Sequence, residues 1–171
     1  VVRRIDDLGR IVLPKELRRT MRIKEGDSLE IYIDENDKIV LKKYSAVKGV
    51  SSFLKEFVDS IYSSNKKDII ITDNEHVVAC AGNFKNDMTG LKISNTLHRK
   101  IKSRQTEIID KNTSIELVED IYTDKALIIK PINVLGDIYG SIIVFSENYI
   151  SDVEKSLVDF GSLFMSRYLE G

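Results

Sequence analysis

Two segments of the chain carry apolar residues alternately three and four positions apart, which is the spacing of one face of an amphipathic helix. The first segment covers residues 45–65 and the second covers residues 150–169. The same spacing forms the seam along which paired helices pack. We therefore predict two helices that cover a sheet and associate with helices of another chain. The predicted oligomerisation residues are Val50, Leu54, Phe57, Ile61, Val153, Leu157, Phe160 and Phe164.

Between these helices, short runs of β-branched and aromatic residues alternate with polar turns, a pattern typical of antiparallel strands. One further helix is predicted at residues 91–103. A sheet crossed by one helix and enclosed by two others is an α+β sandwich. The predicted strands cover residues 68–72, 76–82, 106–110, 114–118, 126–132 and 139–146.

The first 44 residues contain only short elements. Pro14 suits the first position of a helix, which we expect to end near Arg22, and Gly9 lies in a turn between two strands. Elements this short bury too little apolar surface to fold alone, and the segment has no His or Cys for a metal. We therefore predict a homodimer through a separate domain at residues 1–44. Its predicted strands cover residues 1–5, 10–13, 29–34 and 39–44.

Positive charge is concentrated at the start of the chain, although the net charge is −1. Residues 1–24 hold eight Lys and Arg against three acids, whereas the remaining residues hold 18 against 24. On the short helix these cations lie opposite Leu17 and Met21. A cationic surface repeated in a dimer predicts double-stranded DNA as the partner. The predicted DNA-binding residues are Arg3, Arg4, Arg10, Lys15, Arg18, Arg19 and Arg22.

The segment VVRRIDDLGRIVLPKELRRTMRIKEGDSLEIYIDENDKIVLKKY resembles the AbrB-type swapped-hairpin DNA-binding domain over its whole length. In that family two chains interleave their hairpins into one dimeric β-structure. The resemblance implies a transcriptional regulator, activating or repressing, and assigns DNA contacts to Arg3, Arg10, Arg18 and Arg19. Arg4, Lys15 and Arg22 join them on charge. Members of the family with a second domain of this kind regulate forespore genes in endospore formers.

Residues 66–171, preceded by the connecting helix at residues 45–65, follow an order of elements similar to that of a GAF domain. The ligand motif of cyclic-nucleotide-binding GAF domains is missing. The resemblance therefore implies a regulatory domain and leaves open whether it binds a small molecule. Pairing of its helices with those of another dimer predicts a homotetramer. The alternative is that each domain buries both helical stripes within itself.

Enzyme chemistry has no support in the sequence, which contains no catalytic or metal-site motif and implies no cofactor. His76, His98 and Cys80 are interpreted as ordinary surface or packing residues. A single cysteine cannot form an internal disulfide, and the longest apolar run, residues 77–81, is far too short for a membrane span. With no secretory leader, these features predict a cytoplasmic protein without a membrane partner. Because the chain begins at Val1 rather than Met, we expect a few residues to precede it.

The competing function is that of an antitoxin, since similar swapped hairpins occur in antitoxin proteins. Such proteins follow the hairpin domain with a flexible acidic tail that wraps the toxin. Residues 45–171 instead have a patterned apolar core and a net charge of only −3, from 15 bases and 18 acids. The sequence therefore favours the transcriptional regulator.

Overall fold

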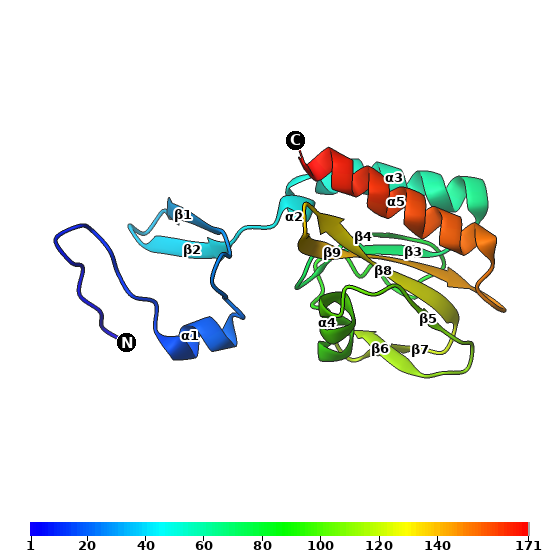
Figure 1. Ribbon diagram of the computed structural model, residues 1–171, viewed down its shortest axis with the longest axis horizontal. Helices are drawn as coiled ribbons and strands as arrows, with labels where there is room; N and C mark the ends of the chain where they lie inside the picture. Colours follow the sequence, from blue (N-terminus) through cyan, green and yellow to red (C-terminus); the bar gives the residue numbers. More distant parts are fainter. Residues whose placement is uncertain (171) are drawn as a thin grey trace. The chain divides into compact units, whose positions relative to one another are not determined.

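The computed structural model describes residues 1–170 and divides into two compact units, Val1–Tyr44 and Ser45–Gly171 (Figure 1). We call these the first unit and the second unit. The first unit contains one helix and one hairpin, namely α1 (Lys15–Thr20), β1 (Leu29–Ile33) and β2 (Ile39–Lys43).

The hairpin of the first unit is closed by a turn that one aspartate organises. β1 and β2 pair antiparallel, from Leu29 opposite Lys43 to Ile33 opposite Ile39. The Asp34 carboxylate accepts the backbone N–H groups of Asn36 and Lys38, at 2.9 and 3.0 Å. This local hydrogen bonding by an Asp side chain is a common way to fix a turn between strands.

The beginning of the first unit differs from the sequence-based expectation. Residues 1–13 contain a turn at residues 7–9 but form no strand, because no strand within residues 1–170 pairs with them. The helix ends at Thr20 rather than Arg22, and Arg22 adopts a left-handed backbone with φ of 54°. The prediction of strands at residues 1–5 and 10–13 is therefore wrong for the single chain.

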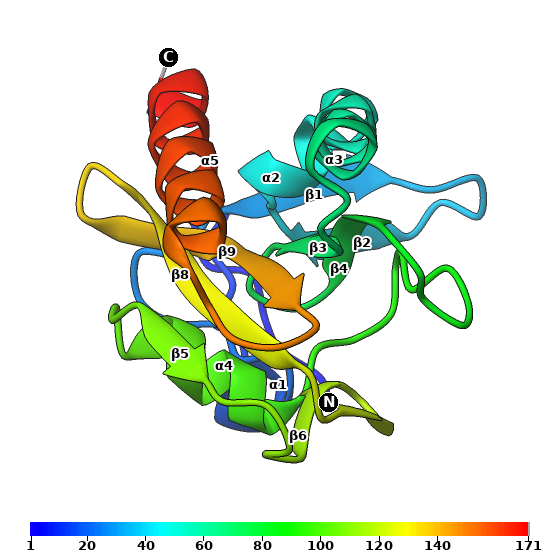
Figure 2. The same ribbon diagram turned by 90° about the vertical axis from the view of Figure 1, so that its right-hand side faces the viewer.

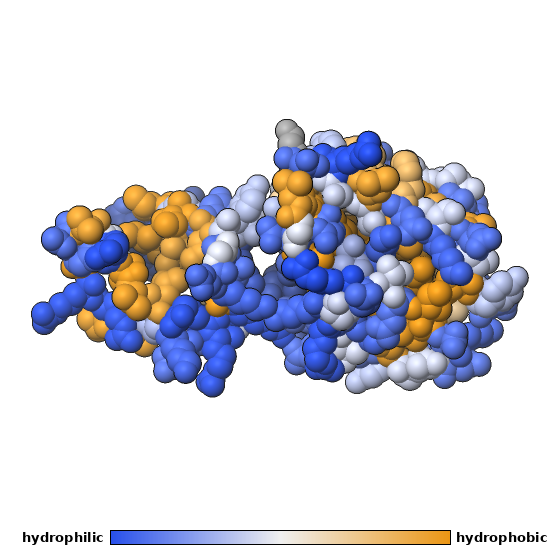
Figure 3. All heavy atoms as spheres, viewed as in Figure 1, coloured by the Kyte–Doolittle hydropathy of each residue, from blue (hydrophilic) through white to orange (hydrophobic). Residues whose placement is uncertain are grey.

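Apolar side chains of the first unit lie at its surface. Within residues 1–44, all of which the structure describes, Pro14 alone is buried. Ile33 and Ile39, which face each other across the hairpin, are each 72% exposed. Figure 3 shows hydrophobic residues gathered on the visible face of this unit. A single chain thus leaves uncovered an apolar surface of the kind that marks a protein interface.

The second unit is built on a five-stranded antiparallel sheet of order β4-β3-β9-β8-β5, and β6 and β7 form a separate hairpin within residues 45–170. Helices α3 and α5 lie on one face of the sheet, and α4 lies on the other (Figure 2). The strands are β3 (Ile69–Thr72), β4 (Val77–Ala81), β5 (Glu107–Ile109), β6 (Ile115–Val118), β7 (Ile121–Thr123), β8 (Ala126–Val134) and β9 (Asp137–Ser146). The helices are α2 (Ala46–Gly49), α3 (Ser51–Asn65), α4 (Asn95–Lys102) and α5 (Asp152–Glu170).

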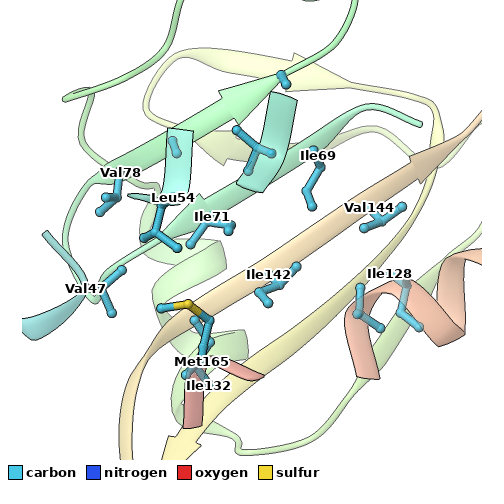
Figure 4. Close-up of a cluster of buried hydrophobic side chains, with 14 of the residues drawn as sticks. Val47, Leu54, Ile69, Ile71, Val78, Ile128, Ile132, Ile142, Val144 and Met165 are labelled. Carbon is cyan, nitrogen blue, oxygen red and sulfur yellow. The ribbon is translucent and has the colours of Figure 1, made fainter. Parts of the chain in front are cut away.

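Both faces of the central strands are buried, which explains their nearly continuous apolar sequences. Ile69 and Ile71 of β3 point toward α3 and α5, whereas Ile70 between them packs with the side chains beneath α4. The core on the α3 side is shown in Figure 4. α5 approaches β9 closely at Gly161, where an added Cβ would lie 2.8 Å from Cδ1 of Ile142. A larger residue at this position would therefore require the Ile142 side chain to move.

Three elements of the second unit differ from the prediction. The helix expected at residues 45–65 is interrupted at Val50, which separates α2 from α3. The helix expected at residues 91–103 begins only at Asn95, where the Ser94 hydroxyl accepts the Leu97 N–H. The short strand β7 was not predicted, because its three residues mix apolar and polar side chains without a clear period.

The stripe residues of α3 and α5 do not share one environment. Leu54 has no exposed surface and belongs to the core of its own domain, so its assignment to an oligomer contact is wrong. Val50, Phe57, Ile61 and Leu157 pack partly against the same core. Val153 and Phe160 are exposed, and Phe164 is half-buried.

The N-terminus of α5 is held by a buried glutamate. The Glu154 carboxylate accepts the N–H and the hydroxyl of Ser151, at 2.9 and 2.5 Å, as in a capping box. Its other oxygen lies 2.9 Å from Nζ of Lys67, just before β3. Burial by itself raises the pKa of Glu154, but the hydrogen bonds from Ser151 and Lys67 outweigh it and lower the pKa to about 2.

We therefore expect Glu154→Gln to remove a pH-dependent part of the stability of the second unit. Because the folded-state pKa lies below the ordinary value of 4.5, this stabilisation is fully present above about pH 5 and is lost as the pH falls toward about 2. Each pKa unit corresponds to about 1.4 kcal/mol, so the contribution of Glu154 to the free energy of unfolding is on the order of 3 kcal/mol. Chemical denaturation of both proteins across this range measures it, and parallel curves would contradict the assignment.

Candidate nucleic-acid interface

The first unit begins with a turn that is closed by Asp6 and positions Arg10. Oδ1 of Asp6 accepts the backbone N–H groups of Leu8 and Arg10, at 2.9 and 2.8 Å. Its Oδ2 lies 2.7 Å from Nε of Arg10. The backbone and side-chain hydrogen bonds from Arg10 hold the pKa of Asp6 below its ordinary value. The Arg10 side chain remains 72% exposed, so it is oriented by Asp6 and still reachable by a phosphate.

The cations of α1 project from a helix whose start is fixed by proline. Pro14 precedes the first helical residue and has no N–H to leave unsatisfied. Nε of Arg18 donates to the carbonyl oxygen of Leu13 at 3.1 Å, which holds that guanidinium against the incoming chain. Lys15 and Arg19 are exposed. The helix therefore presents three cations of which one is anchored.

Arg22 differs from the other predicted residues. It is half-buried, and its carbonyl oxygen accepts a hydrogen bond from Nζ of Lys43 at 3.1 Å. This contact joins the end of α1 to strand β2. Arg22 therefore lies at the contact between the end of α1 and strand β2, which its positive charge alone does not predict.

Most of the cationic side chains lack acidic partners. Arg3, Arg4, Lys15, Arg18 and Arg19 form no ion pair with any residue in the range 1–170. They lie in two groups, one on the extended segment before the Asp6 turn and one on α1. A surface whose positive charges are not neutralised within the protein is suited to bind phosphates.

The second unit carries an aromatic ridge, which we define as the stacked rings of Phe53, Phe57, Phe160, Phe164 and Tyr168 on α3 and α5. The centroid of the Phe53 ring lies 4.9 Å from the centroid of the Tyr168 ring and 5.7 Å from that of the Phe164 ring. Phe164 also contacts Phe57 and Phe160, at 6.2 and 6.1 Å. Phe53 and Tyr168, which the stripe did not include, complete the ridge. Phe160 is 58% exposed, so the ridge reaches the surface.

Residues that were considered for chemistry have ordinary environments. Cys80 is buried, and this burial raises the pKa of its thiol. His98 lies 4.0 Å from Glu75, and His76 follows the turn between β3 and β4. Across the described chain no group of three or more His, Cys, Asp or Glu is placed to hold a metal ion. Nor does any helix within residues 1–170 combine the length and apolar character needed to cross a bilayer.

Comparisons with known proteins match both units. A family model described as "Stage V sporulation protein T C-terminal, transcription factor" matches residues 49–170, and one described as "Antidote-toxin recognition MazE, bacterial antitoxin" matches residues 2–49. Stage V sporulation protein T of Bacillus subtilis is 38% identical over 172 residues, which cover 99% of this chain and 97% of that protein. The transition state regulatory protein AbrB of the same organism is 61% identical over 44 residues, 26% of this chain and 45% of that protein.

The second unit has the GAF fold. The GAF domain of an Acinetobacter phosphoenolpyruvate-protein phosphotransferase superposes with a TM-score of 0.55 at 11% identity, covering 74% of this chain and 83% of that one. An AbrB-like first unit joined to a GAF-fold unit defines a two-domain transcription factor. The chain belongs to the stage V sporulation protein T family.

The Asp6 turn yields a test of the first unit. Gly9 has a φ of +78° and open space around it, so Gly9→Val strains the backbone without a steric clash. We expect a loss of about 1–2 kcal/mol in the first unit, because non-glycine residues avoid this conformation. Hydrogen exchange followed separately over residues 1–44 and 45–170 measures it. The neighbouring Asp7→Val is the control, and equal protection in both variants would rule out the turn assignment.

Proposed function

We propose that this protein is a DNA-binding regulator of forespore genes that acts as a dimer in the cytoplasm of a sporulating cell. The observation that carries the proposal is the set of exposed cations on the first unit without acidic partners. The relationship to stage V sporulation protein T, which extends over 99% of the chain, supports the sporulation role. The proposed DNA contacts come from Arg3, Arg4, Arg10, Lys15, Arg18, Arg19 and Arg22.

The proposed dimer follows from the lack of an interior in the first unit. Pro14 is the single buried residue of residues 1–44, and residues 1–13 have no strand partner among residues 1–170. A second copy supplies both, since its extended segment pairs with the first and its hairpin covers the exposed isoleucines. Such a dimer doubles the cationic surface and has the two-fold symmetry that matches duplex DNA.

The antitoxin hypothesis has one observation in its favour, namely the MazE model that matches residues 2–49. An antitoxin tail, however, stays flexible until it wraps its toxin. Residues 45–170 instead fold into a sheet with an apolar core on each face. The transcriptional regulator therefore remains the better-supported function.

DNA binding should depend steeply on salt. If two copies of the cationic surface neutralise about six to eight phosphates, the slope of log affinity against log salt is roughly −5 to −7. Arg19→Ala, which removes two of these contacts per dimer, should reduce the steepness by about two. Fluorescence anisotropy with a labelled duplex measures both quantities.

The control for this experiment is Lys38→Ala, since Lys38 is an exposed cation of the same unit at the tip of the hairpin. We expect its salt slope to equal that of the parent protein. Arg18→Ala is less clean because it also removes the hydrogen bond to Leu13. A slope near zero in the parent, or equal losses for Lys38→Ala and Arg19→Ala, would contradict the proposed surface.

We further propose that the aromatic ridge joins second units into a helical bundle, so that two dimers form a tetramer. Around Phe160, the side chains of Val153 and Leu163 are also exposed on α5. The sheet does not need these side chains, because Leu54, Val58 and Val158 already cover it. An uncovered apolar face on two adjacent helices is suited to pair with the same face of another chain.

Phe160→Glu should abolish this association without unfolding the protein, because Phe160 is largely exposed. Sedimentation of the full chain should then show a dimer, and fragment 45–171 should become monomeric. Lys155→Glu is the control, since it adds negative charge to an exposed position on another side of α5. A parent fragment that stays folded and monomeric at high micromolar concentration would refute the bundle.

A further inference from the structure

A cavity of about 240 Å³ lies within the second unit, where the turn between β3 and β4 meets the beginning of α3. It is smaller than the roughly 300–1,000 Å³ of sites for drug-sized molecules, so an occupant must be small. Its lining residues carry one carboxylate, one ammonium group, one imidazole, two hydroxyls and two apolar side chains. The lining residues are Lys48, Ser51, Asp73, His76, Val77, Val78, Thr89 and Gly90.

Asp73 is unusual among these residues because it carries a carboxylate and yet is only 6% exposed. Its Oδ1 accepts the backbone N–H groups of Glu75 and His76, at 2.8 and 2.7 Å, and so fixes the turn. Its Oδ2 receives no hydrogen bond from any residue between 1 and 170. Among the described residues, every fully enclosed side-chain oxygen or nitrogen has a hydrogen-bond partner. Because Oδ2 of Asp73 has no such partner, it cannot be fully enclosed and must reach open space. Asp73 is one of the residues that line the cavity. This carboxylate oxygen is therefore free to accept a hydrogen bond from a molecule in the cavity.

Two other lining residues supply hydrogen-bond donors. Lys48 of α2 and Ser51 at the start of α3 have side chains without partners among residues 1–170. An ammonium and a hydroxyl group together suit a ligand carboxylate. Val78 of β4 belongs to the core on the α3 side and retains 6% exposure, so it provides an apolar contact. The cavity thus offers a fixed negative group, a positive group and an apolar surface.

We propose that this cavity binds a small zwitterionic α-amino acid. The ligand ammonium group donates to Oδ2 of Asp73, the ligand carboxylate pairs with Lys48 and Ser51, and a short side chain packs on Val78. A fully ionised dicarboxylate has no hydrogen-bond donor for Asp73, and phosphate has hydroxyl donors but carries a negative charge that the Asp73 carboxylate repels. The inference deepens the proposed regulatory function of the second unit and rests on it.

The cavity places a bound ligand in contact with α2, the first helix of the second unit. Lys48 lies in α2, the short helix that follows the junction after Tyr44, and Val47 beside it is fully buried in the core. A ligand held between Lys48 and Asp73 therefore ties α2 to the turn between β3 and β4. Only Tyr44 and Ser45 separate the end of β2 at Lys43 from the start of α2 at Ala46.

The test is a thermal-shift and calorimetric titration of the full-length protein with each of the L-amino acids. We expect at least one amino acid with a short apolar side chain to raise the melting temperature by about 3 °C at roughly ten times its Kd. The matching α-hydroxy acid, which lacks the ammonium group, and the matching amide, which lacks the carboxylate, should bind at least about tenfold more weakly.

Two variants assign this binding to the cavity. Asp73→Asn keeps an oxygen acceptor for the turn but loses the negative charge, and Lys48→Met keeps the aliphatic stem but loses the ammonium group. Each should weaken amino-acid binding by about tenfold or more, whereas Lys85→Met, at an exposed position outside the cavity, should not. Should Asp73→Asn fail to fold, Lys48→Met and the ligand analogues still decide the question.

The proposal is overturned if no amino acid binds, if binding survives both substitutions, or if inorganic phosphate or succinate binds in place of amino acids. DNA affinity measured without added amino acid separates this result from a failure of the proposed function. Asp73→Asn and Lys48→Met should bind DNA as the parent does, because both residues lie outside the first unit. If the parent itself failed to bind DNA while still binding an amino acid, the DNA-binding function would be wrong and the cavity assignment would stand.

Discussion

The first unit has too little interior to be stable as a single chain, and this constraint determines much of the rest. Its short helix buries none of its residues, and its hairpin leaves isoleucines exposed. A domain of this size needs a disulfide, a metal or a second subunit, and its sequence offers neither of the first two. The same apolar exposure that makes one chain incomplete thus makes a dimer favourable. The proposed dimer would bring two sets of cations onto one particle, which a polyanion with two-fold symmetry can engage.

The fold of the second unit could be predicted largely from hydrophobic patterning, because both faces of its sheet are covered. Ile69, Ile70 and Ile71 form an uninterrupted apolar run, which identifies a buried strand without specifying the face of each residue. The prediction failed where the decisive information was not periodic. β7 is too short to show a period. The first helix is interrupted directly after Gly49, a residue of low helix propensity whose presence in a helical pattern does not by itself specify a break. Residues 1–13 have the composition of strands, but a strand also requires a neighbour, and the chain alone provides none.

The candidate sites, like the fold, could be predicted only in part from the sequence. Charge counting found the cations of the first unit, since an excess of Lys and Arg over acids in one segment is visible in a sequence. It did not show that Asp6 orients Arg10 or that Arg22 turns back with φ of 54°. A stripe of apolar residues likewise does not state which side of a helix faces the sheet. Leu54 belongs to the core, while Phe53 beside it stacks on Tyr168 in the aromatic ridge. The cavity near Asp73 depends on residues from three separate segments, so no sequence motif could have revealed it.

Helix α3 is common to both proposed activities of the second unit. Its first residue, Ser51, lines the cavity, and Phe53 within the same turn belongs to the aromatic ridge. Residues in one helical turn move together, because the backbone hydrogen bonds of the helix hold them at fixed positions. A ligand that draws the beginning of α3 toward the turn at Asp73 therefore also shifts the ring of Phe53. By thermodynamic linkage, a ligand that favours one arrangement of the ridge must bind more tightly to the assembly that uses that arrangement. If both proposals hold, ligand binding and association of the second units are coupled through α3, even though their contact residues do not overlap.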